Sequence, residues 1–199
     1  MIPTVRTTSR LLAKMDSGQS DYRFMFVKDG VGNVTNKKCL ARFEVNLPPG
    51  KYEIDALGTC RQVFDDNLVA HCPIDPELVR PPFESMPPRC VITQADLFSF
   101  LPILQAAKER QETMYIEKKG MGPKRTGEIY LDYPFNVADI VEVDADYLHM
   151  AFTDLLRYPS IELYQEAENK PLVLGYGWRN CWLIAPIADQ YRHYYNDRD

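Results

Sequence analysis

Residues 168–187 read ENKPLVLGYGWRNCWLIAPI, two short apolar stretches joined by a turn that holds two glycines and an asparagine. Apolar runs of this length between turn residues are typical of buried β-strands. Gly175, Gly177 and Asn180 supply the backbone freedom that a tight turn requires. The sequence therefore predicts a β-hairpin, with side chains that alternate toward and away from a core.

An amphipathic helix is predicted before this hairpin, in the stretch ADYLHMAFTDLLRYP at residues 145–159. Asp144 precedes the helix as an N-cap, and Pro159 ends it. A further strand is expected at residues 160–165. The apolar stripe of the helix consists of Leu148, Ala151, Phe152, Leu155 and Leu156.

A similar helix is predicted earlier in the chain, in QADLFSFLPILQAAKERQ at residues 94–111. Thr93 and Asp96 have the spacing of a capping box at its start. Because a proline in a helix interior removes a hydrogen bond, Pro102 predicts a kink or a later helix start. Strands are expected afterwards at residues 113–117 and 127–131. The apolar face of this helix consists of Leu97, Phe100, Leu101, Leu104 and Ala107.

The first part of the chain, residues 1–72, has a different pattern. Its only predicted helix is at residues 7–15, and a turn-prone stretch is expected at residues 29–36. The predicted strands lie at residues 22–28, 40–47 and 51–57. This part is therefore interpreted as a mainly β domain.

A proline-rich stretch, PIDPELVRPPFESMPP, separates the two parts and holds six prolines in sixteen residues. Prolines at this density exclude a regular helix and favour a stiff, extended connector. The sequence therefore predicts a linker at residues 73–89.

The segment at residues 141–187 resembles the last part of a bacterial DNA polymerase sliding-clamp domain. Shared features are a capped helix with an early Tyr-Leu pair, a strand of alternating polarity, a strand led by Lys-Pro, and a final apolar strand that ends at a proline. Residues 91–109 look like the first helix of that domain with its entering strand. The residues that carry the resemblance of the last part are Asp144, Tyr147, Leu148, 161–164, Lys170, Pro171, Ala185 and Pro186.

The resemblance covers residues 90–187 and implies an α+β fold. It predicts a sliding-clamp-like domain of antiparallel sheet plus two helices, preceded by the mostly β N-terminal domain. Residues 1–72 are interpreted as a degenerate clamp-like unit. An aromatic and charged tail follows at residues 188–199.

The resemblance also implies a function. A sliding clamp is a non-enzymatic ring that encloses duplex DNA, contacts phosphates through Lys and Arg, and docks peptides of DNA polymerases and other replication proteins. By analogy three two-domain chains would form one ring, so a homo-oligomer, a trimer, is expected. The candidate DNA-binding residues are Lys108, Arg110, Lys118, Lys119, Lys124, Arg125 and Arg157. The candidate partner-binding residues are Leu174, Tyr176, Pro186 and Ile187.

The charge pattern keeps a second interpretation open. The net charge is −5, and the second helix carries Asp146 and Asp154 beside His149 and Arg157. The basic stretch at residues 118–125 also fits a solvated hairpin tip. The alternative is a clamp-fold protein-binding or inhibitor module, for example a phage-encoded one, that binds a protein rather than DNA.

Other classes have weaker support. The five cysteines form no CxxC pair, which argues against a zinc site. No nucleophile elbow, P-loop or dinucleotide-binding motif indicates an enzyme or a cofactor. The chain lacks an apolar run of membrane-spanning length and a secretory signal, so a cytoplasmic location without membrane partners is expected.

Overall fold

The computed structural model shows two compact units. Met1–Ser85 and Gly175–Leu183 make up the first, and Met86–Leu174 and Ile184–Asp199 the second. The predicted helix at 7–15 and the tail at 188–199 lie outside the described residues. The structure describes residues 24–36, 38–55, 57–64, 72, 74–80, 90–123, 131–135, 137, 140–167 and 170–187.

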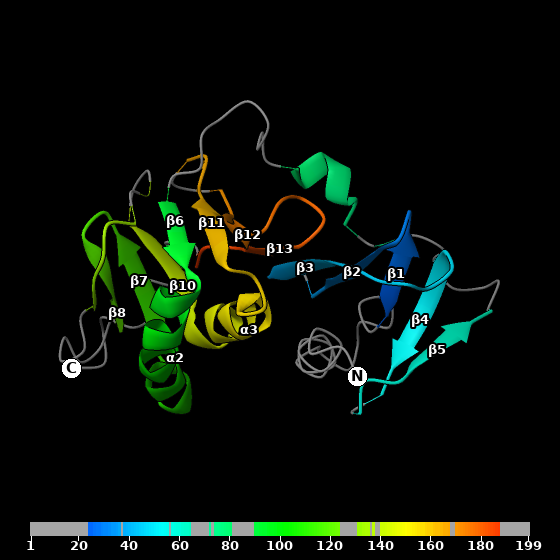
Figure 1. Ribbon diagram of the computed structural model, residues 1–199, viewed down its shortest axis with the longest axis horizontal. Helices are drawn as coiled ribbons and strands as arrows, with labels where there is room; N and C mark the ends of the chain where they lie inside the picture. Colours follow the sequence, from blue (N-terminus) through cyan, green and yellow to red (C-terminus); the bar gives the residue numbers. More distant parts are fainter. Residues whose placement is uncertain are drawn as a thin grey trace. The chain divides into compact units, whose positions relative to one another are not determined.

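The first unit is a sheet with the strand order β5-β4-β1-β2-β3-β13 (Figure 1). The pairs from β5 to β3 are antiparallel. A short 3-10 helix, η2 (Pro76–Val79), lies in the stretch predicted as a linker. The strands are β1 (Met25–Lys28), β2 (Val31–Thr35), β3 (Cys39–Glu44), β4 (Gly50–Ile54), β5 (Cys60–Val63) and β13 (Cys181–Ile184), the last of which leaves this unit at Ile184.

Strand β2 lies within residues 29–36, where a turn-prone stretch was predicted, so that prediction is wrong for most of the stretch. The turn consists of two residues with positive φ, 52° at Asp29 and 73° at Gly30, and a fully buried strand follows. Asn33 is buried in that strand because its side-chain amide donates hydrogen bonds to two backbone carbonyls. Because Asn33 is polar, β2 could not be recognised as a core strand from the sequence.

The second unit contains strands of two sheets, with the orders β12-β11-β6 and β10-β7-β8-β9. Strand β6 pairs antiparallel with β11, and β7 pairs antiparallel with both β10 and β8. The strands are β6 (Cys90–Thr93), β7 (Thr113–Glu117), β8 (Gly120–Pro123), β9 (Leu131–Asp132), β10 (Val141–Asp144), β11 (Ser160–Tyr164) and β12 (Leu172–Gly175), the last of which enters the first unit at Gly175.

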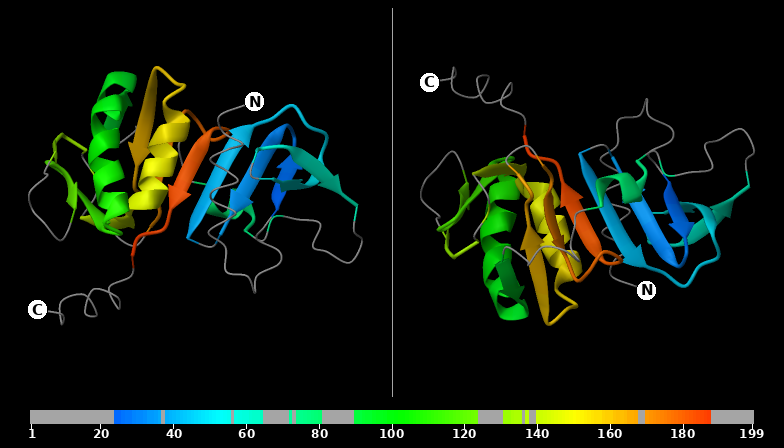
Figure 2. Two further views of the ribbon diagram at one scale, coloured as in Figure 1. Left: turned by 90° about the horizontal axis from the view of Figure 1, so that it is seen from below. Right: turned by 90° about the horizontal axis from the view of Figure 1, so that it is seen from above.

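Two helices belong to the second unit, as predicted: α2 (Gln94–Glu109) and α3 (Ala145–Leu155). They run side by side in both views of Figure 2 and contact each other. Helix α2 also packs on β6 and β7, which lie in different sheets, so the helix pair connects the sheets of this unit.

Both helix starts agree with the predicted caps. Thr93 and Asp96 form a complete capping box, and the Asp144 carboxylate accepts a hydrogen bond from the backbone N–H of Asp146. The predicted later start of the first helix is wrong, because α2 begins directly at its cap and includes Pro102. Pro102 lies on the exposed side, where water can reach backbone groups that lose a helical partner.

Aromatic side chains fill the interior of the second unit. The Phe100 ring lies 5.0 Å from Tyr133 and 6.0 Å from Phe152 between centroids, and Tyr133 lies 4.9 Å from Phe135. The Tyr133 hydroxyl also donates to the Asp96 carboxylate, at 3.0 Å. The aromatic cluster therefore connects the start of α2 with the segment after β9.

The turn of the predicted hairpin lies in the first unit. The Tyr176 N–H donates to the Asn180 carbonyl at 2.8 Å, and the Asn180 N–H donates to the Gly177 carbonyl at 3.2 Å. Gly177 has φ +75°, whereas Gly175 lies against Cys181, with no room for a side chain. The two glycines are therefore required for different physical reasons.

Candidate interaction surfaces

The hairpin turn is attached to strand β3 through polar contacts within the first unit. The Arg179 guanidinium donates to the Glu44 carboxylate at 2.9 Å and to the Asp29 carbonyl at 3.0 Å. The Asn180 side chain accepts from the Glu44 backbone N–H at 3.1 Å and donates to its carboxylate at 3.3 Å. These bonds position the neighbouring Trp178.

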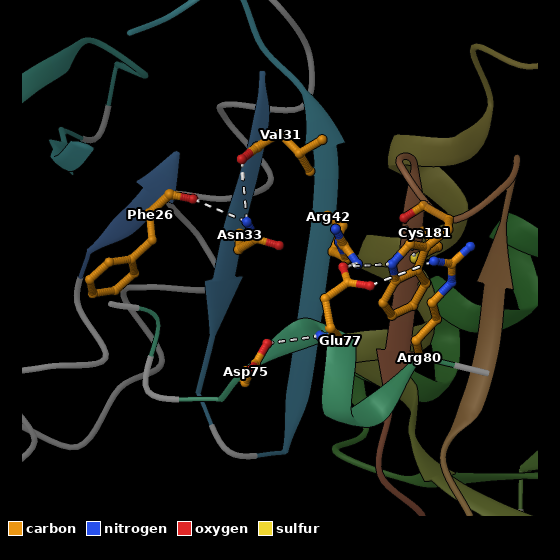
Figure 3. Close-up of polar contacts among 9 residues, drawn as sticks. Phe26, Val31, Asn33, Arg42, Asp75, Glu77, Arg80 and Cys181 are labelled. Atoms are coloured by element: carbon orange, nitrogen blue, oxygen red, sulfur yellow. Dashed lines mark hydrogen bonds and ion pairs between the residues drawn. The ribbon is translucent and has the colours of Figure 1, made fainter. Parts of the chain in front are cut away.

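A buried arginine lies next to this turn (Figure 3). Arg42 projects from β3, and only 7% of its side chain is exposed. Its guanidinium carbon lies 4.0 Å from the centroid of the Trp178 ring, and its Nη1 donates to Glu77 Oε1 at 3.3 Å. The same Glu77 oxygen accepts from the Trp178 indole N–H at 3.2 Å. We call Arg42, Glu77 and Trp178 the arginine–tryptophan cluster.

The electrostatics of the cluster follow from these contacts. Burial lowers the pKa of Arg42, although an arginine stays protonated near neutral pH. The hydrogen bond from Trp178, together with Arg42, lowers the pKa of Glu77. Burial raises the pKa of the neighbouring Cys181 thiol to about 12, so this cysteine is uncharged at neutral pH. The cluster therefore holds one cation and one anion.

The cations predicted on the two helices lie beside acids. Lys108 Nζ is 3.3 Å from Asp146 Oδ1, and Arg157 Nη1 is 3.6 Å from the buried Asp154 carboxylate. Helix α3 contains no Lys or Arg of its own. The helices therefore present little net positive charge.

The other predicted DNA-binding residues lie elsewhere. Arg110 is the exposed C-cap of α2. Lys118 and Lys119 form the exposed two-residue turn between β7 and β8, because Glu117 pairs with Gly120. Lys124 and Arg125 lie outside the described residues. The basic stretch at residues 118–125 thus begins as a hairpin tip and continues into strand β8.

The four predicted partner-binding residues differ in exposure. Leu174 is fully buried in the second unit, whereas 52% of Tyr176 is exposed in the turn of the first unit. Pro186 and Ile187 are half-buried in the second unit, and the Ile187 N–H donates to the Glu142 carbonyl at 2.8 Å. Of these side chains, Tyr176 offers the most surface to a partner.

The arginine–tryptophan cluster could not be predicted from the sequence. Its members are separated by 35 and 101 residues along the chain. The single available signal was Arg42 itself, a charged residue in the predicted strand at residues 40–47. A charge flanked by Ala41 and Phe43 in a buried strand requires a partner.

Metal and membrane sites are not found within the described parts of the chain. No group of three or more His, Cys, Asp or Glu side chains is arranged there to hold a metal ion. No helix there is long and apolar enough to cross a membrane.

Comparison with solved structures identifies the architecture. The DNA polymerase III β subunit of Borrelia burgdorferi superimposes with a TM-score of 0.60 at 13% identity, covering 94% of this chain and 63% of the clamp chain. The fold is that of a bacterial sliding clamp. The Pseudomonas aeruginosa clamp matches with a TM-score of 0.59 at 11% identity, covering 94% of this chain and 64% of the clamp.

A third solved clamp, from Helicobacter pylori, is bound to a DNA ligase peptide. It matches with a TM-score of 0.57 at 11% identity, and the match covers 92% of this chain and 63% of the clamp. The chain thus spans about 63% of the length of these clamps. No protein-family model and no curated protein matches the sequence. The predicted resemblance is therefore confirmed at the level of the fold, and it extends well beyond residues 90–187.

Proposed function

We propose that this chain is a non-enzymatic sliding-clamp-like scaffold of DNA replication that assembles with copies of itself around duplex DNA. The observation that carries the proposal is the match of 92–94% of the chain to solved bacterial clamps. A likeness confined to one domain would fit many unrelated roles, whereas this one includes both units.

The length of the match supports a particular assembly. The chain corresponds to 63–64% of each clamp, which is close to two thirds. If each unit acts as one clamp domain, and the first is a reduced copy, three chains supply the six domains of a clamp ring. A closed trimer with cyclic symmetry has six such domains. Such a ring would act in the cytoplasm, where replication takes place.

In this proposal the phosphate contacts come from Arg110, Lys118 and Lys119, whose side chains are exposed. Lys124 and Arg125 would extend the same basic stretch, and Lys108 and Arg157 would contribute less beside their acidic neighbours. Contacts to phosphates provide affinity without base readout, as a sliding protein requires.

Protein partners would dock as short peptides, as the ligase peptide does on the H. pylori clamp. Pro186 and Ile187 of the second unit are proposed as part of that docking surface, and Tyr176 of the first unit is proposed as a separate partner contact. Their exposed or half-exposed rings and methyl groups offer apolar area to a peptide. Leu174, buried in the second unit, would support the Pro186 and Ile187 part from the interior.

A second candidate function has its own supporting observation. The acidic neighbours of Lys108 and Arg157, and the lack of Lys and Arg in α3, reduce the attraction of the helices for phosphate. A clamp-fold module that binds a protein partner, for example a phage-encoded inhibitor of replication, needs no basic channel.

Retention on circular DNA separates the two candidates. The full-length protein is incubated with a nicked plasmid, gel-filtered at about 0.3 M salt, and compared with the same plasmid after linearisation. A ring is retained on the circle and lost from the linear form, because it slides off the ends. Equal loss from both forms contradicts the DNA-clamp proposal and favours the protein-binding module. The variant Asp146→Asn, which removes the acid beside Lys108, is a control for charge, since it strengthens electrostatic binding to both forms alike.

A further inference from the structure

In the arginine–tryptophan cluster, the hydrogen-bond donors of Arg42 are only partly used. Arg42 is 93% buried, since 7% of its side chain is exposed, and its Nε is a buried donor without a hydrogen-bond acceptor. Its contact with Glu77 is a single bond of 3.3 Å. Arginine–carboxylate pairs reach about 2.7–2.9 Å and often use two donors. The site therefore has donor capacity that Glu77 does not use.

The anion in this site comes from a short segment of the same chain. Glu77 lies in the four-residue helix η2, whose first turn is capped by the Asp75 carboxylate. Its side chain is 57% exposed, in contrast to the buried Arg42. Arg80 Nη1 is also 3.6 Å from the second Glu77 oxygen (Figure 3). A ligand from solution can approach the outer side of this carboxylate.

We propose that Arg42 and Trp178 form a carboxylate-binding site on the first unit, which Glu77 fills within the chain, and that its external ligand is an acidic side chain of a partner peptide. The indole N–H and the guanidinium donate to one oxygen from two directions, which suits a carboxylate. The Trp178 ring covers the face of the guanidinium and excludes water from one side.

The exchange is balanced in charge and in hydrogen bonds. An incoming carboxylate takes the place of Glu77 at the buried guanidinium, and Glu77 moves into water. Arg42 is the buried cation of the site, whereas the nearby Arg80 is 40% exposed, so a single carboxylate matches the buried charge better than a dicarboxylate or a phosphate. Glu77 competes as an intramolecular ligand, and removing it strengthens external binding by about 10-fold, given the usual strength of hydrogen bonds to charged groups.

The indole N–H resonance of Trp178 tests this site. The full-length variant Glu77→Gln keeps the shape of the side chain but removes the competing charge. It is titrated with the blocked peptide acetyl-Gly-Gly-Glu-Gly-Gly-amide, and a peptide with Gln in place of Glu is the control. The variant Trp178→Phe identifies the resonance, because the chain has only two tryptophans.

The expected result is a saturable shift of the Trp178 resonance in Glu77→Gln with the Glu peptide alone. The same shift appears in the wild-type protein at about 10-fold higher peptide concentration. No shift, or an equal shift with the Gln peptide, overturns the proposal. If Glu77→Gln does not fold, the wild-type titration decides: a shift with the Glu peptide alone supports the site, and its absence overturns it.

Discussion

Two glycines in the hairpin turn provide a matched pair of substitutions that separates steric overlap from backbone strain. A Cβ at Gly175 would lie 2.5 Å from Cys181 Cβ, 2.7 Å from the Asn180 carbonyl oxygen and 2.9 Å from Cys181 Cα. A Cβ at Gly177 would meet nothing within 4 Å, but this residue has φ +75°. Both positions lie in the first unit, within three residues of each other.

The expected cost differs accordingly. In Gly175→Ala two of the three overlapping atoms are backbone and cannot rotate away, so the strands must move apart. We expect a loss of about 3 kcal/mol in the free energy of unfolding, at the upper end for overpacking. In Gly177→Ala the cost is the left-handed backbone alone, about 1 kcal/mol.

Urea unfolding followed by tryptophan fluorescence measures both variants. The only tryptophans of the sequence are Trp178, within this turn, and Trp182, in β13, so the signal reports on the first unit. Gly177→Ala serves as the control for adding a methyl group to the same hairpin.

The difference between the two variants is the critical quantity. We expect it to be about 2 kcal/mol, with Gly175→Ala the less stable protein. Equal losses, or a larger loss in Gly177→Ala, would refute the close approach of Gly175 and Cys181.

Three further predictions concern the helix cap, the arginine–tryptophan cluster and the basic turn. Thr93→Ala removes the capping box of α2 and should lower the free energy of unfolding by about 1 kcal/mol, measured in urea. Thr93→Ser is the near-neutral control, and an unchanged stability in Thr93→Ala would contradict the cap. The pKa of Glu77 is lowered by Trp178, so Glu77 contributes its full stability above the usual glutamate pKa and loses it as the pH falls through the lowered value. Glu77→Gln should therefore flatten the decline of Tm toward acid pH, and an unchanged decline would show that the carboxylate is not held. If both lysines contact phosphate, Lys118→Ala/Lys119→Ala should reduce the slope of log affinity for DNA against log salt concentration by about 2. Thermal melting is the folding control, and an unchanged slope would exclude both lysines as phosphate contacts.

Local signals in the sequence were sufficient for the helices. The Thr93–Asp96 capping box and the Asp144 cap use residues that are two or three positions apart, so the sequence contains the whole interaction. The hairpin strands β12 and β13 were recognisable because both are short and apolar in the sequence. Both are fully buried in the structure. In each case one segment determines its own structure.

Interactions between distant segments could not be predicted. Strand β5 is half-exposed and polar, and it forms because β4 offers hydrogen-bonding groups along its whole length. Strand β2 resembled a turn because its Gly32 and Asn33 are poor strand formers, and pairing on both sides overrides that preference. The ion pair between Arg42 and Glu77 requires the folded sheet before the two residues meet.

The predicted DNA-binding residues illustrate the same limit. Their positive charges were visible in the sequence, but the positions of Asp146 and Asp154 relative to Lys108 and Arg157 depend on how the helix ends are packed. The contact between Arg157 and Asp154 was foreseeable because the two residues are three positions apart. The contact between Lys108 and Asp146 was not, because these residues come from different helices.

The molecular mass in solution decides whether the chain forms a ring of three copies. Multi-angle light scattering of the full-length protein, over a range of concentrations and at moderate salt, reports the mass without a DNA ligand. We expect a closed species of three chains, each of 23.0 kDa, whose mass stays constant as the concentration changes. A monomer at all concentrations, with or without duplex DNA, would contradict this expectation.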